Sequence, residues 1–294
     1  MKLKQVLERI DAALIPNEAI ITQLLHEEDG EPYRVWKIDT GYGQFILKKA
    51  KENEAERYLA VCSLAPESVP ALHQVITVEE KTYLLMEYIE GEDLCGCNRK
   101  KLICALDALI AMQEDTWELE ERGCLAGSFL DSLHQRQHRG KYLMDAQLEE
   151  AYDGFLRVYQ TVPKALCHDD LLPFNIICGD EKAYFIDWEC GGMLPYPTSL
   201  ARLIAHGEEK EDALFYMTEE DKDFAIAYYY ENLVKKKGIS YLTWRNTLEY
   251  FLFYEYCEWV FVGNKYDVTD GEYYQKYLPM AKQQAAKVLS LGYK

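Results

Sequence analysis

Two neighbouring stretches decide the fold: residues 167–177 read CHDDLLPFNII, and residues 184–189 read YFIDWE. Between Asn175 and Asp187, two short apolar runs flank a polar, glycine-containing turn at 178–182. This pattern predicts a β-hairpin, with Asn175 entering one strand and Asp187 leaving the other. Because both ends of a hairpin lie on the same side, the amide and the carboxylate are expected to converge.

Asp170 precedes Asn175 by five residues, on the loop before the predicted hairpin. A carboxylate and an amide oxygen held together are hard ligands that suit Mg²⁺, with phosphate oxygens and water completing the coordination. Asn175 and Asp187 are therefore candidate metal ligands, and Asp170 is a candidate acceptor of a proton from a substrate hydroxyl. Phosphoryl transfer requires this arrangement, because the protein's part in it is positioning and charge neutralisation.

The pattern His168-x-Asp170-x4-Asn175, followed by IDWE at 186–189, resembles the aminoglycoside phosphotransferase and choline kinase superfamily. Its spacing also matches the H-R-D-x-x-x-x-N and D-F-G elements of protein kinases. The resemblance implies an α+β, two-lobe, protein-kinase-like fold, in which a small antiparallel β-sheet lobe with one helix precedes a larger, mostly helical lobe. It also implies transfer of the γ-phosphoryl group of Mg-ATP, or of GTP, to a small-molecule hydroxyl.

By the same resemblance, Asp170 is the catalytic residue, and Asn175 and Asp187 hold Mg²⁺. His168 is expected to support the loop by hydrogen bonding and not to act as the base. The family pattern has glycine where this chain has Asp169, so two carboxylates stand side by side. We assign the chemistry to Asp170 because it keeps the five-residue spacing to Asn175.

Composition excludes several classes of partner. The 294-residue chain has a formal net charge of −18, which argues against nucleic acid and against anionic membrane surfaces. No uncharged apolar run approaches the length of a membrane span, and residues 1–18 are amphipathic and charged, unlike a signal peptide. Nine cysteines without C-x-x-C pairs suit free thiols in a reducing compartment, so a cytoplasmic protein is predicted.

Residues 1–88 are predicted to form the nucleotide-binding lobe. A first amphipathic helix should end at Pro16, and its apolar stripe consists of Val6, Leu7, Ile10 and Leu14. Alternating apolar and polar residues then predict three strands, a helix at about 51–63, and two more strands. The predicted strands cover residues 20–26, 33–39, 44–49, 71–78 and 81–88.

In this lobe, the apolar strand that ends at Lys48 and Lys49 is where the family carries the lysine that binds the α- and β-phosphates. Only one of two successive strand residues faces the cleft, and the order Phe-Ile-Leu-Lys favours Lys48. The family's usual spacing makes Glu52 its partner, while Glu54 and Glu56 lie nearby as alternatives.

Residues 89–294 are predicted to form the catalytic and substrate-binding helical lobe. The resemblance identifies Glu87 and Tyr88 as the hinge, where backbone groups would bind the nucleotide base. Asn98 is expected to cap a helix that runs to about Met112. Further helices are predicted at 130–142, 147–159, 225–233, 242–262 and 273–289.

Two segments of this lobe depart from expectation. Segment 134–141 is basic within an acidic chain, and a solvated helix face is the favoured interpretation over an anion or partner site. Its basic residues are His134, Arg136, His138, Arg139 and Lys141. At 198–202 the chain reads TSLAR, without the acidic residue that the family commonly carries just before the next helix. How that helix is anchored is therefore left open.

The acceptor site is predicted from composition. Helical residues 250–262 embed Glu255 and Glu258 among rings that include Trp259. A carboxylate together with aromatic faces suits a cationic acceptor such as choline, another amine or an aminoglycoside. A helix packed on both sides, with its glutamates at the rim, is the favoured alternative. Glu189 is the stronger candidate for substrate contact, because Asp-Trp-Glu resembles the choline kinase branch.

Two interpretations from other classes stay open. A pseudokinase would bind nucleotide without transfer, and it is supported by loop 27–32, which has one glycine and four acidic residues where a glycine-rich phosphate cradle is expected. A structural protein of the spore-coat type shares this fold, and abundant tyrosines are compatible with it. The sequence leaves open the acceptor, the choice between ATP and GTP, and the oligomeric state.

Overall fold

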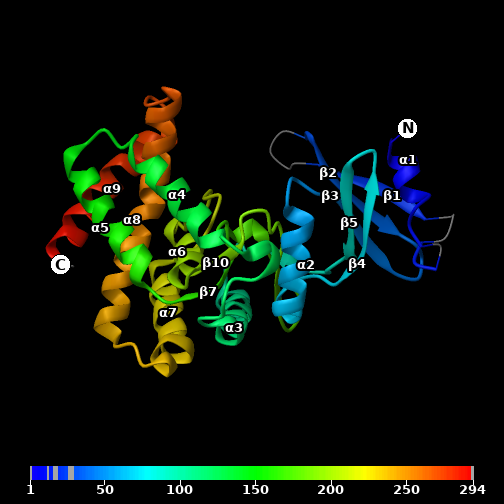
Figure 1. The fold of residues 1–294 in the computed structure, drawn as a ribbon, viewed down its shortest axis with the longest axis horizontal. Helices are drawn as coiled ribbons and strands as arrows, with labels where there is room; N and C mark the ends of the chain where they lie inside the picture. The colour runs from blue at the N-terminus through cyan, green and yellow to red at the C-terminus, as the bar shows by residue number, and fades with distance from the viewer. Residues whose placement is uncertain (1, 12, 16–18, 26–29, 293–294) are drawn as a thin grey trace.

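The computed structural model describes residues 2–11, 13–15, 19–25 and 30–292. Figure 1 shows a small part that contains a β-sheet at one end of the molecule and a larger helical part at the other. The sheet is built from the beginning of the chain and the helices α3 to α9 from the remainder. This arrangement confirms the predicted α+β organisation, while the predicted boundary after residue 88 stays a prediction.

In the described residues, five strands form one antiparallel sheet in the order β1-β2-β3-β5-β4. The strands are β1 (Ile20–Leu25), β2 (Pro32–Asp39), β3 (Gln44–Lys49), β4 (Leu72–Val78) and β5 (Lys81–Glu87). Each described strand lies within one residue of its predicted bounds. Strand β3 is central, and Lys48 pairs with Val35 on one side and Leu84 on the other.

The alternation of β3 decides which way Lys48 faces. Leu47 is buried in the apolar cluster that α1 (Lys2–Leu7) covers, whereas Ile46 packs into the cluster that contains Tyr58 of α2 (Glu54–Leu64). Because Lys48 lies two residues after Ile46, its side chain is on the α2 side of the sheet. The position favoured from the sequence is therefore the one that faces the rest of the molecule.

Helix α1 is shorter than predicted. Val6 and Ile10 are buried together, as the apolar stripe indicated, but the helix ends at Leu7. The Asp11 carboxylate accepts a hydrogen bond from the amide of Ala13 at 2.9 Å, and such a local bond competes with helix continuation. The predicted end at Pro16 lies outside the described residues, as do residues 27–29 of the acidic loop.

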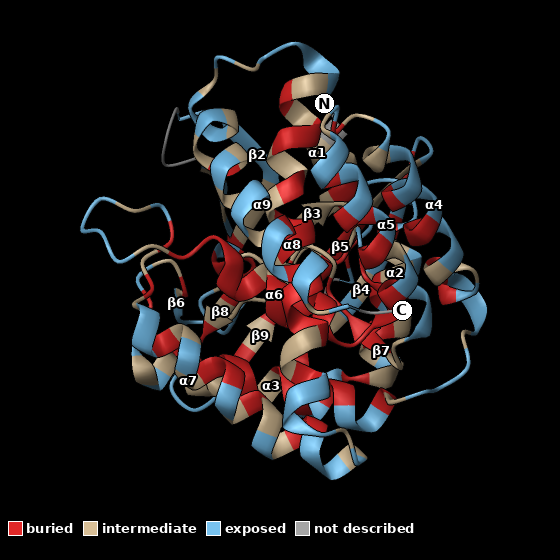
Figure 2. Ribbon diagram, turned by 90° about the vertical axis from the view of Figure 1, so that its left-hand side faces the viewer, coloured by how far each residue is buried: buried red, intermediate tan, exposed pale blue. Residues whose placement is uncertain are grey.

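Seven further helices of the described residues form the larger part. They are α3 (Arg99–Thr116), α4 (Ser128–Gly140), α5 (Ala146–Thr161), α6 (Pro197–Ala205), α7 (Glu219–Tyr229), α8 (Tyr241–Tyr266) and α9 (Glu272–Ser290). Asn98 caps α3 as predicted, accepting from the Lys101 amide at 3.0 Å. A π-helical turn, Tyr230–Val234, continues α7. Helix α8 packs against α5, α6 and α9, and Figure 2 shows buried positions along it.

Short strands at the junction of the two parts carry the loop with Asp170 and Asn175 and the segment with Asp187. Strand β7 (Lys164–Cys167) pairs with β10 (Gly192–Pro195), and β8 (Ile176–Cys178) pairs with both β9 (Ala183–Phe185) and β6 (Glu92–Asp93). The predicted hairpin is confirmed. Its strands bring the loop before β8 beside the segment that follows β9.

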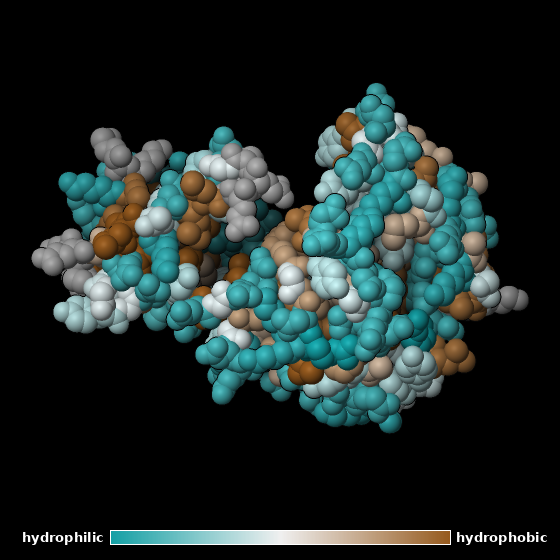
Figure 3. Space-filling view, turned by 180° about the vertical axis from the view of Figure 1, so that it is seen from behind, coloured by the Kyte–Doolittle hydropathy of each residue, from teal (hydrophilic) through white to brown (hydrophobic). Residues whose placement is uncertain are grey.

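The surface is hollowed between the two parts, and hydrophilic residues cover much of the face seen in Figure 3. Among the helices of the described residues, none combines the length and the apolar character that crossing a membrane would require.

Gly91 allows the segment after β5 to approach β8. A Cβ atom at this position would overlap the backbone carbonyl of Cys178. We expect Gly91→Ala to lower the free energy of unfolding by about 1–3 kcal/mol, the usual cost of overpacking, as measured by urea denaturation. Gly96→Ala is the matched control, since a Cβ there meets no described atom within 4 Å. Equal losses in the two variants would contradict this account.

Candidate active site

The loop that carries the predicted catalytic residue begins at a buried histidine. His168 Nε2 lies 2.7 Å from the carbonyl oxygen of Ile186, and the amide of Asp170 donates to Nδ1 at 3.3 Å. Nε2 therefore carries the proton and Nδ1 accepts one, which defines a neutral ring. Burial lowers the pKa of His168, against the opposing effects of the Ile186 carbonyl and nearby carboxylates. His168 thus links this loop to the end of β9.

Helix α6 anchors the same loop through Ser199. The amide of His168 donates to Ser199 Oγ at 2.9 Å, and the hydroxyl lies 3.3 Å from the carbonyl oxygen of His168. A neutral hydroxyl therefore holds the loop backbone where the family commonly has an acidic residue. Sequence reasoning missed this contact, because a serine within an apolar helix carries no distinct signal.

Asn175 joins Asp170 to the hairpin. Its Nδ2 donates to the carbonyl oxygen of Asp170 at 2.8 Å and lies 3.5 Å from Asp170 Oδ2. Its backbone carbonyl accepts from the amide of Ile186 at 3.0 Å, which brings Asn175 beside Asp187. Because Nδ2 is engaged by Asp170, Oδ1 is the Asn175 atom suited to bind a cation.

Asp187 turns the chain immediately after β9. Its backbone is left-handed, with φ 63°, a conformation that aspartate tolerates better than most residues. Its Oδ1 lies 2.8 Å from Lys48 Nζ. Burial would raise the pKa of Asp187, but Lys48 and then Lys51 outweigh that effect and hold the pKa below its ordinary value. The carboxylate is therefore ionised at neutral pH, as metal binding requires.

Lys48 has a second carboxylate partner, Glu54, at 2.5 Å. The predicted partner, Glu52, is wrong: it is exposed and precedes α2, whereas the Glu54 side chain is 1% exposed. The cause is Asn53, whose left-handed backbone (φ 63°) delays the start of α2 to Glu54. The Glu54 carboxylate also accepts from the amide of Lys51 at 2.9 Å, which closes the first turn.

Glu189 connects the two parts of the molecule. Its carboxylate lies 2.5 Å from Lys51 Nζ, and its backbone carbonyl accepts from Arg57 of α2. Burial opposes the charge on Lys51, but the hydrogen bond that Lys51 donates to Glu189, together with the nearby carboxylates, outweighs it and raises the pKa of Lys51. Glu189 is therefore paired with Lys51 while its side chain stays 29% exposed, and acceptor contact at Glu189 stays a prediction.

The basic segment 134–141 is not simply a solvated face, contrary to the favoured interpretation. Arg136 is buried, its Nη2 lies 2.5 Å from Asp169 Oδ1, and its guanidinium stacks on the rings of Tyr159 and Tyr254. The carboxylate of Asp169, which is adjacent to Asp170 in the sequence, requires a cation when it is withdrawn from water. Asp169 in place of glycine was therefore the signal that could have revealed Arg136.

Helix α8 does not offer free carboxylates to an acceptor. Glu255 is 2% exposed and lies 2.9 Å from Arg202 of α6. Glu258 pairs with Arg139 of α4, and burial raises the pKa of Glu258 despite this partner. The two predicted substrate carboxylates are thus paired within the protein, and the packed-helix alternative holds for the helix but not for Glu255, which is buried and does not lie at the rim.

Trp259 keeps an accessible aromatic surface. Its ring stacks on that of Tyr273 of α9, with centroids 4.3 Å apart and an interplanar angle of 13°. Tyr277 stacks on the same indole at 6.0 Å. Trp259 is partly exposed and Tyr273 is exposed, so this stack is open to a ligand, and acceptor contact at Trp259 stays a prediction.

Arg202 is a further site residue that the sequence did not single out. Its Nη2 lies 2.7 Å from Asp170 Oδ1, so the predicted catalytic carboxylate already has an internal cation. In the sequence, segment 198–202 stands out only because it lacks the acidic residue that the family commonly carries there. An arginine on a helix is ordinarily solvated, so Arg202 gave no signal of a contact with Asp170.

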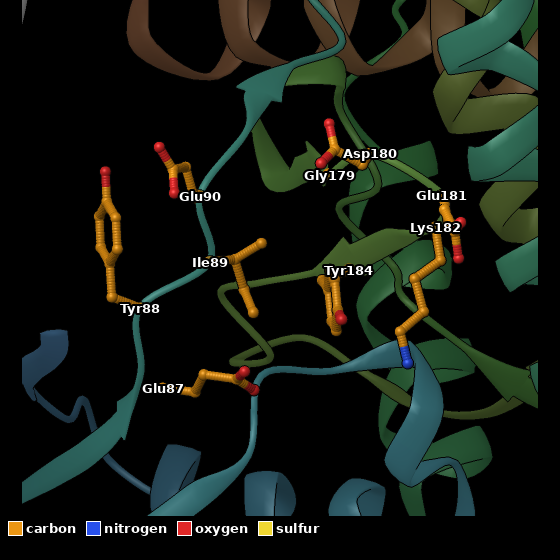
Figure 4. A pocket seen from close by; sticks show the side chains of 9 residues that line it. All are labelled: Glu87, Tyr88, Ile89, Glu90, Gly179, Asp180, Glu181, Lys182 and Tyr184. Carbon is orange, nitrogen blue, oxygen red and sulfur yellow. The ribbon is translucent and has the colours of Figure 1, made fainter. Parts of the chain in front are cut away.

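A cavity of about 420 Å³ lies between the predicted hinge and the turn that joins β8 to β9. Figure 4 shows Ile89 on one wall and Tyr184 on the opposite wall, with Tyr88 pointing away from Tyr184. The lining residues are Glu87, Tyr88, Ile89, Glu90, Gly179, Asp180, Glu181, Lys182 and Tyr184.

The hinge amides are only partly free. The amide of Glu87 donates to the Ala71 carbonyl at 2.8 Å, and that of Tyr88 donates to the Gln44 carbonyl at 3.3 Å. These two amides therefore bond within the sheet and are not available to a nucleotide base. The expectation that backbone groups at Glu87 and Tyr88 bind the base is corrected for their amides. For the Ile89 amide, no partner occurs within the part of the chain that is described.

The donor set at the hairpin fits a magnesium ion bound together with phosphate. Asp187 and Asn175 Oδ1 supply oxygen ligands, and Mg²⁺ is usually held by one or two protein groups, with phosphates and waters completing the shell. Among the described residues, no cluster of three or more His, Cys, Asp or Glu side chains is placed to hold a metal ion alone.

Comparison with known proteins identifies the family of this chain. Residues 22–231 match the phosphotransferase enzyme family, over more than half of the chain. The chain belongs to this family. Among curated protein sequences, none matches the phosphotransferase.

Solved structures of small-molecule kinases share the fold of this phosphotransferase. Choline kinase LicA from Streptococcus pneumoniae is 16% identical, with a TM-score of 0.61 over 98% of this chain and 100% of that one. A Plasmodium vivax ethanolamine kinase is 13% identical, with a TM-score of 0.60 over 94% and 85%. The amicoumacin kinase hAmiN, in complex with AMP-PNP, Ca²⁺ and Ami, is 12% identical, with a TM-score of 0.62 over 99% and 94%. These likenesses confirm the two-lobe, protein-kinase-like fold.

Burial of neutral His168 predicts a loss of stability in acid. The folded chain resists protonation there, whereas the unfolded chain binds a proton near pH 6.5. The contribution of neutral His168 to the free energy of unfolding is therefore complete above about pH 6.5. Below that pH it falls, by at most about 1.4 kcal/mol per pH unit. In urea titrations between pH 7.5 and 5.5, we expect a smaller acid loss for His168→Asn than for the parent. His134→Asn, which removes an exposed histidine, should keep the parent slope, and equal slopes for all three proteins would contradict the prediction.

Proposed function

We propose that this phosphotransferase transfers the γ-phosphoryl group of Mg-ATP to the hydroxyl of a small molecule. The observation that carries the proposal is a continuous set of contacts: Lys48 with Asp187, and Asn175 with both Asp170 and the residue before Asp187. These groups come from β3, the loop before β8 and the end of β9, so the fold itself brings them together. Together they provide what phosphoryl transfer requires, namely a cation for phosphates, oxygen ligands for a metal and an acceptor for a proton.

Each residue has a defined part in this proposal. Lys48 would neutralise the α- and β-phosphates, and Asp187 with Asn175 Oδ1 would hold Mg²⁺. Bound Mg²⁺ supplies charge neutralisation on the phosphate oxygens. The acceptor oxygen bonds to the γ-phosphorus as the bond from that phosphorus to the β–γ bridging oxygen breaks, and ADP leaves. Asp170 orients the hydroxyl and accepts its proton.

The nucleotide base is proposed to bind at the hinge. The Ile89 amide, which has no partner among the described residues, and backbone carbonyls of the hinge are suited to the edge of a purine. Under this proposal residues 1–88 serve as the nucleotide-binding lobe and residues 89–294 as the catalytic and acceptor-binding lobe. ATP is the proposed donor, and competition between ATP and GTP for the purified protein tests that choice.

For the acceptor, we propose a cationic amino alcohol such as choline, or an aminoglycoside. The stacked rings of Trp259 and Tyr273 support this choice, because a cation is attracted to aromatic faces. Relatives of the same fold are named as choline, ethanolamine and amicoumacin kinases. Since arginines neutralise Glu255 and Glu258, recognition would depend on rings more than on free carboxylates.

The deciding experiment is Mg²⁺-dependent ADP release from ATP across a panel of acceptors. The panel contains choline, ethanolamine, several aminoglycosides, simple sugars, methylthioribose and homoserine. Release that depends on one acceptor class supports the proposal and names the acceptor. A flat panel with protein that Mg-ATP stabilises against heat would favour a pseudokinase, and a flat panel without such stabilisation would favour a binding or structural role of the spore-coat type.

Asp170→Asn tests the catalytic assignment. The variant keeps the shape of the side chain and loses the proton acceptor, so turnover should fall by roughly 10²-fold or more while Mg-ATP affinity stays within twofold. ADP release and calorimetric titration measure the two quantities. The control is Asp153→Asn, at an exposed position of α5, which should behave as the parent. An active Asp170→Asn would show that the assignment is wrong.

Glu54→Gln and Glu52→Gln form a matched pair that tests how Lys48 is held. Loss of the buried Glu54 carboxylate frees Lys48, and a hydrogen bond between charged groups is worth roughly a tenfold to hundredfold change in an equilibrium. We expect Mg-ATP affinity to fall by that factor in Glu54→Gln and to be unchanged in Glu52→Gln. The reverse order of effects would restore Glu52 as the partner.

A further inference from the structure

The Asp170 carboxylate is gripped through one of its two oxygens. Arg202 of α6 donates to Oδ1 with both Nε, at 3.1 Å, and Nη2, at 2.7 Å. Asp170 Oδ2 lies 3.5 Å from the side-chain nitrogen of Asn175. Of the two Asp170 oxygens, Oδ1 is the one that the Arg202 guanidinium contacts. The carboxylate is therefore held more closely at Oδ1 than at Oδ2.

The opposite edge of the same guanidinium is held from α8. Arg202 Nη1 donates to Glu255 Oε2 at 2.9 Å. His206 Nε2 lies 3.3 Å from the same oxygen, and His206 Nδ1 lies 2.8 Å from the Tyr277 hydroxyl on α9. With Nε2 donating to Glu255 and Nδ1 accepting from Tyr277, the chain of hydrogen bonds is consistent from α9 to Asp170.

The two carboxylates that Arg202 binds differ in burial, since the Glu255 side chain is 3% exposed and that of Asp170 is 34% exposed. Burial alone would raise the pKa of Glu255, but the charge of Arg202 outweighs it and holds that pKa below its ordinary value. Arg202 thus lies between two carboxylates, Asp170 and Glu255, each bound by a different edge of its planar fork. A lysine carries one point charge and lacks this fork, so it would not span both groups equally well.

We propose that Arg202 is a positioning residue for the catalytic Asp170, and that Glu255 acts behind it by fixing Arg202. This rests on the proposed function, in which Asp170 receives the acceptor proton. Helix α6 then holds the catalytic loop twice within one turn: Ser199 binds the backbone of His168, and Arg202 binds the side chain of Asp170. Glu255 accordingly serves the geometry of the base and does not bind the acceptor.

The test compares Arg202→Gln, Arg202→Lys and Glu255→Gln with a matched control, Arg99→Gln. Arg99 also pairs with a largely buried carboxylate, Asp221 at 2.9 Å, but on α3 and α7. Hydrogen exchange of the amides in residues 168–176 reports how firmly the loop is held and needs no acceptor. ADP release, with water as acceptor if the panel yields none, gives kcat and the KM for Mg-ATP.

We expect loop exchange to be roughly tenfold or more faster in Arg202→Gln, and to rise less in Arg202→Lys and Glu255→Gln. We expect kcat to fall roughly 10²-fold in Arg202→Gln, with partial recovery in Arg202→Lys and KM for Mg-ATP within twofold of the parent. Arg99→Gln should change neither quantity. A merely structural role would move Mg-ATP affinity and kcat together.

Unchanged loop exchange in folded Arg202→Gln, or an equal change in Arg99→Gln, would overturn the proposal. If Arg202→Gln does not fold, Glu255→Gln decides, since it keeps the side-chain shape and removes only the charge behind Arg202. Failure of the proposed function has a separate signature. Asp170→Asn would then retain ADP release, while the exchange experiment still reports on the contact between Arg202 and the loop.

Discussion

Lys48 lies between two carboxylates from different parts of the molecule, Glu54 of α2 and Asp187 after β9, and the geometry of the site depends on this contact. Either carboxylate alone would be costly to withdraw from water, and the shared ammonium compensates both. The pair of Lys51 with Glu189 reinforces the same junction. The sheet and the helical part are thereby held in the relative position that brings Lys48 to Asp187, at the end of the hairpin where we propose that a metal binds.

Around the catalytic loop, arginines balance the charge of an acidic chain. Asp169 is bound by Arg136, while Arg202 lies between Asp170 and Glu255. These guanidiniums come from α4 and α6, so the loop is held from several directions at once. Glutamates that suggested a cation site in the sequence are therefore paired with arginines, and the partly exposed Trp259–Tyr273 stack is the proposed place for an acceptor.

Much of this was predictable where the relevant contacts are local. The hairpin followed from two apolar runs and a polar turn, and the side of β3 that carries Lys48 followed from strand alternation. The partner of Lys48 was not predictable from spacing, because one left-handed residue, Asn53, changes where α2 begins. Arg136 was not predictable either, since a basic residue at helical spacing resembles a solvated one until α4 is placed against the loop.

The sequence by itself determined the hairpin, the five-residue spacing of Asp170 and Asn175, and the α+β organisation, because turns and side-chain alternation act through the backbone over short distances. Tertiary structure alone decided which charges meet. Arg136 and Asp169 are 33 residues apart, Arg202 and Glu255 are 53 apart, and Lys48 and Asp187 are 139 apart. Such pairs form only when elements far apart in the sequence pack together, since packing excludes the water that would otherwise solvate each charge separately.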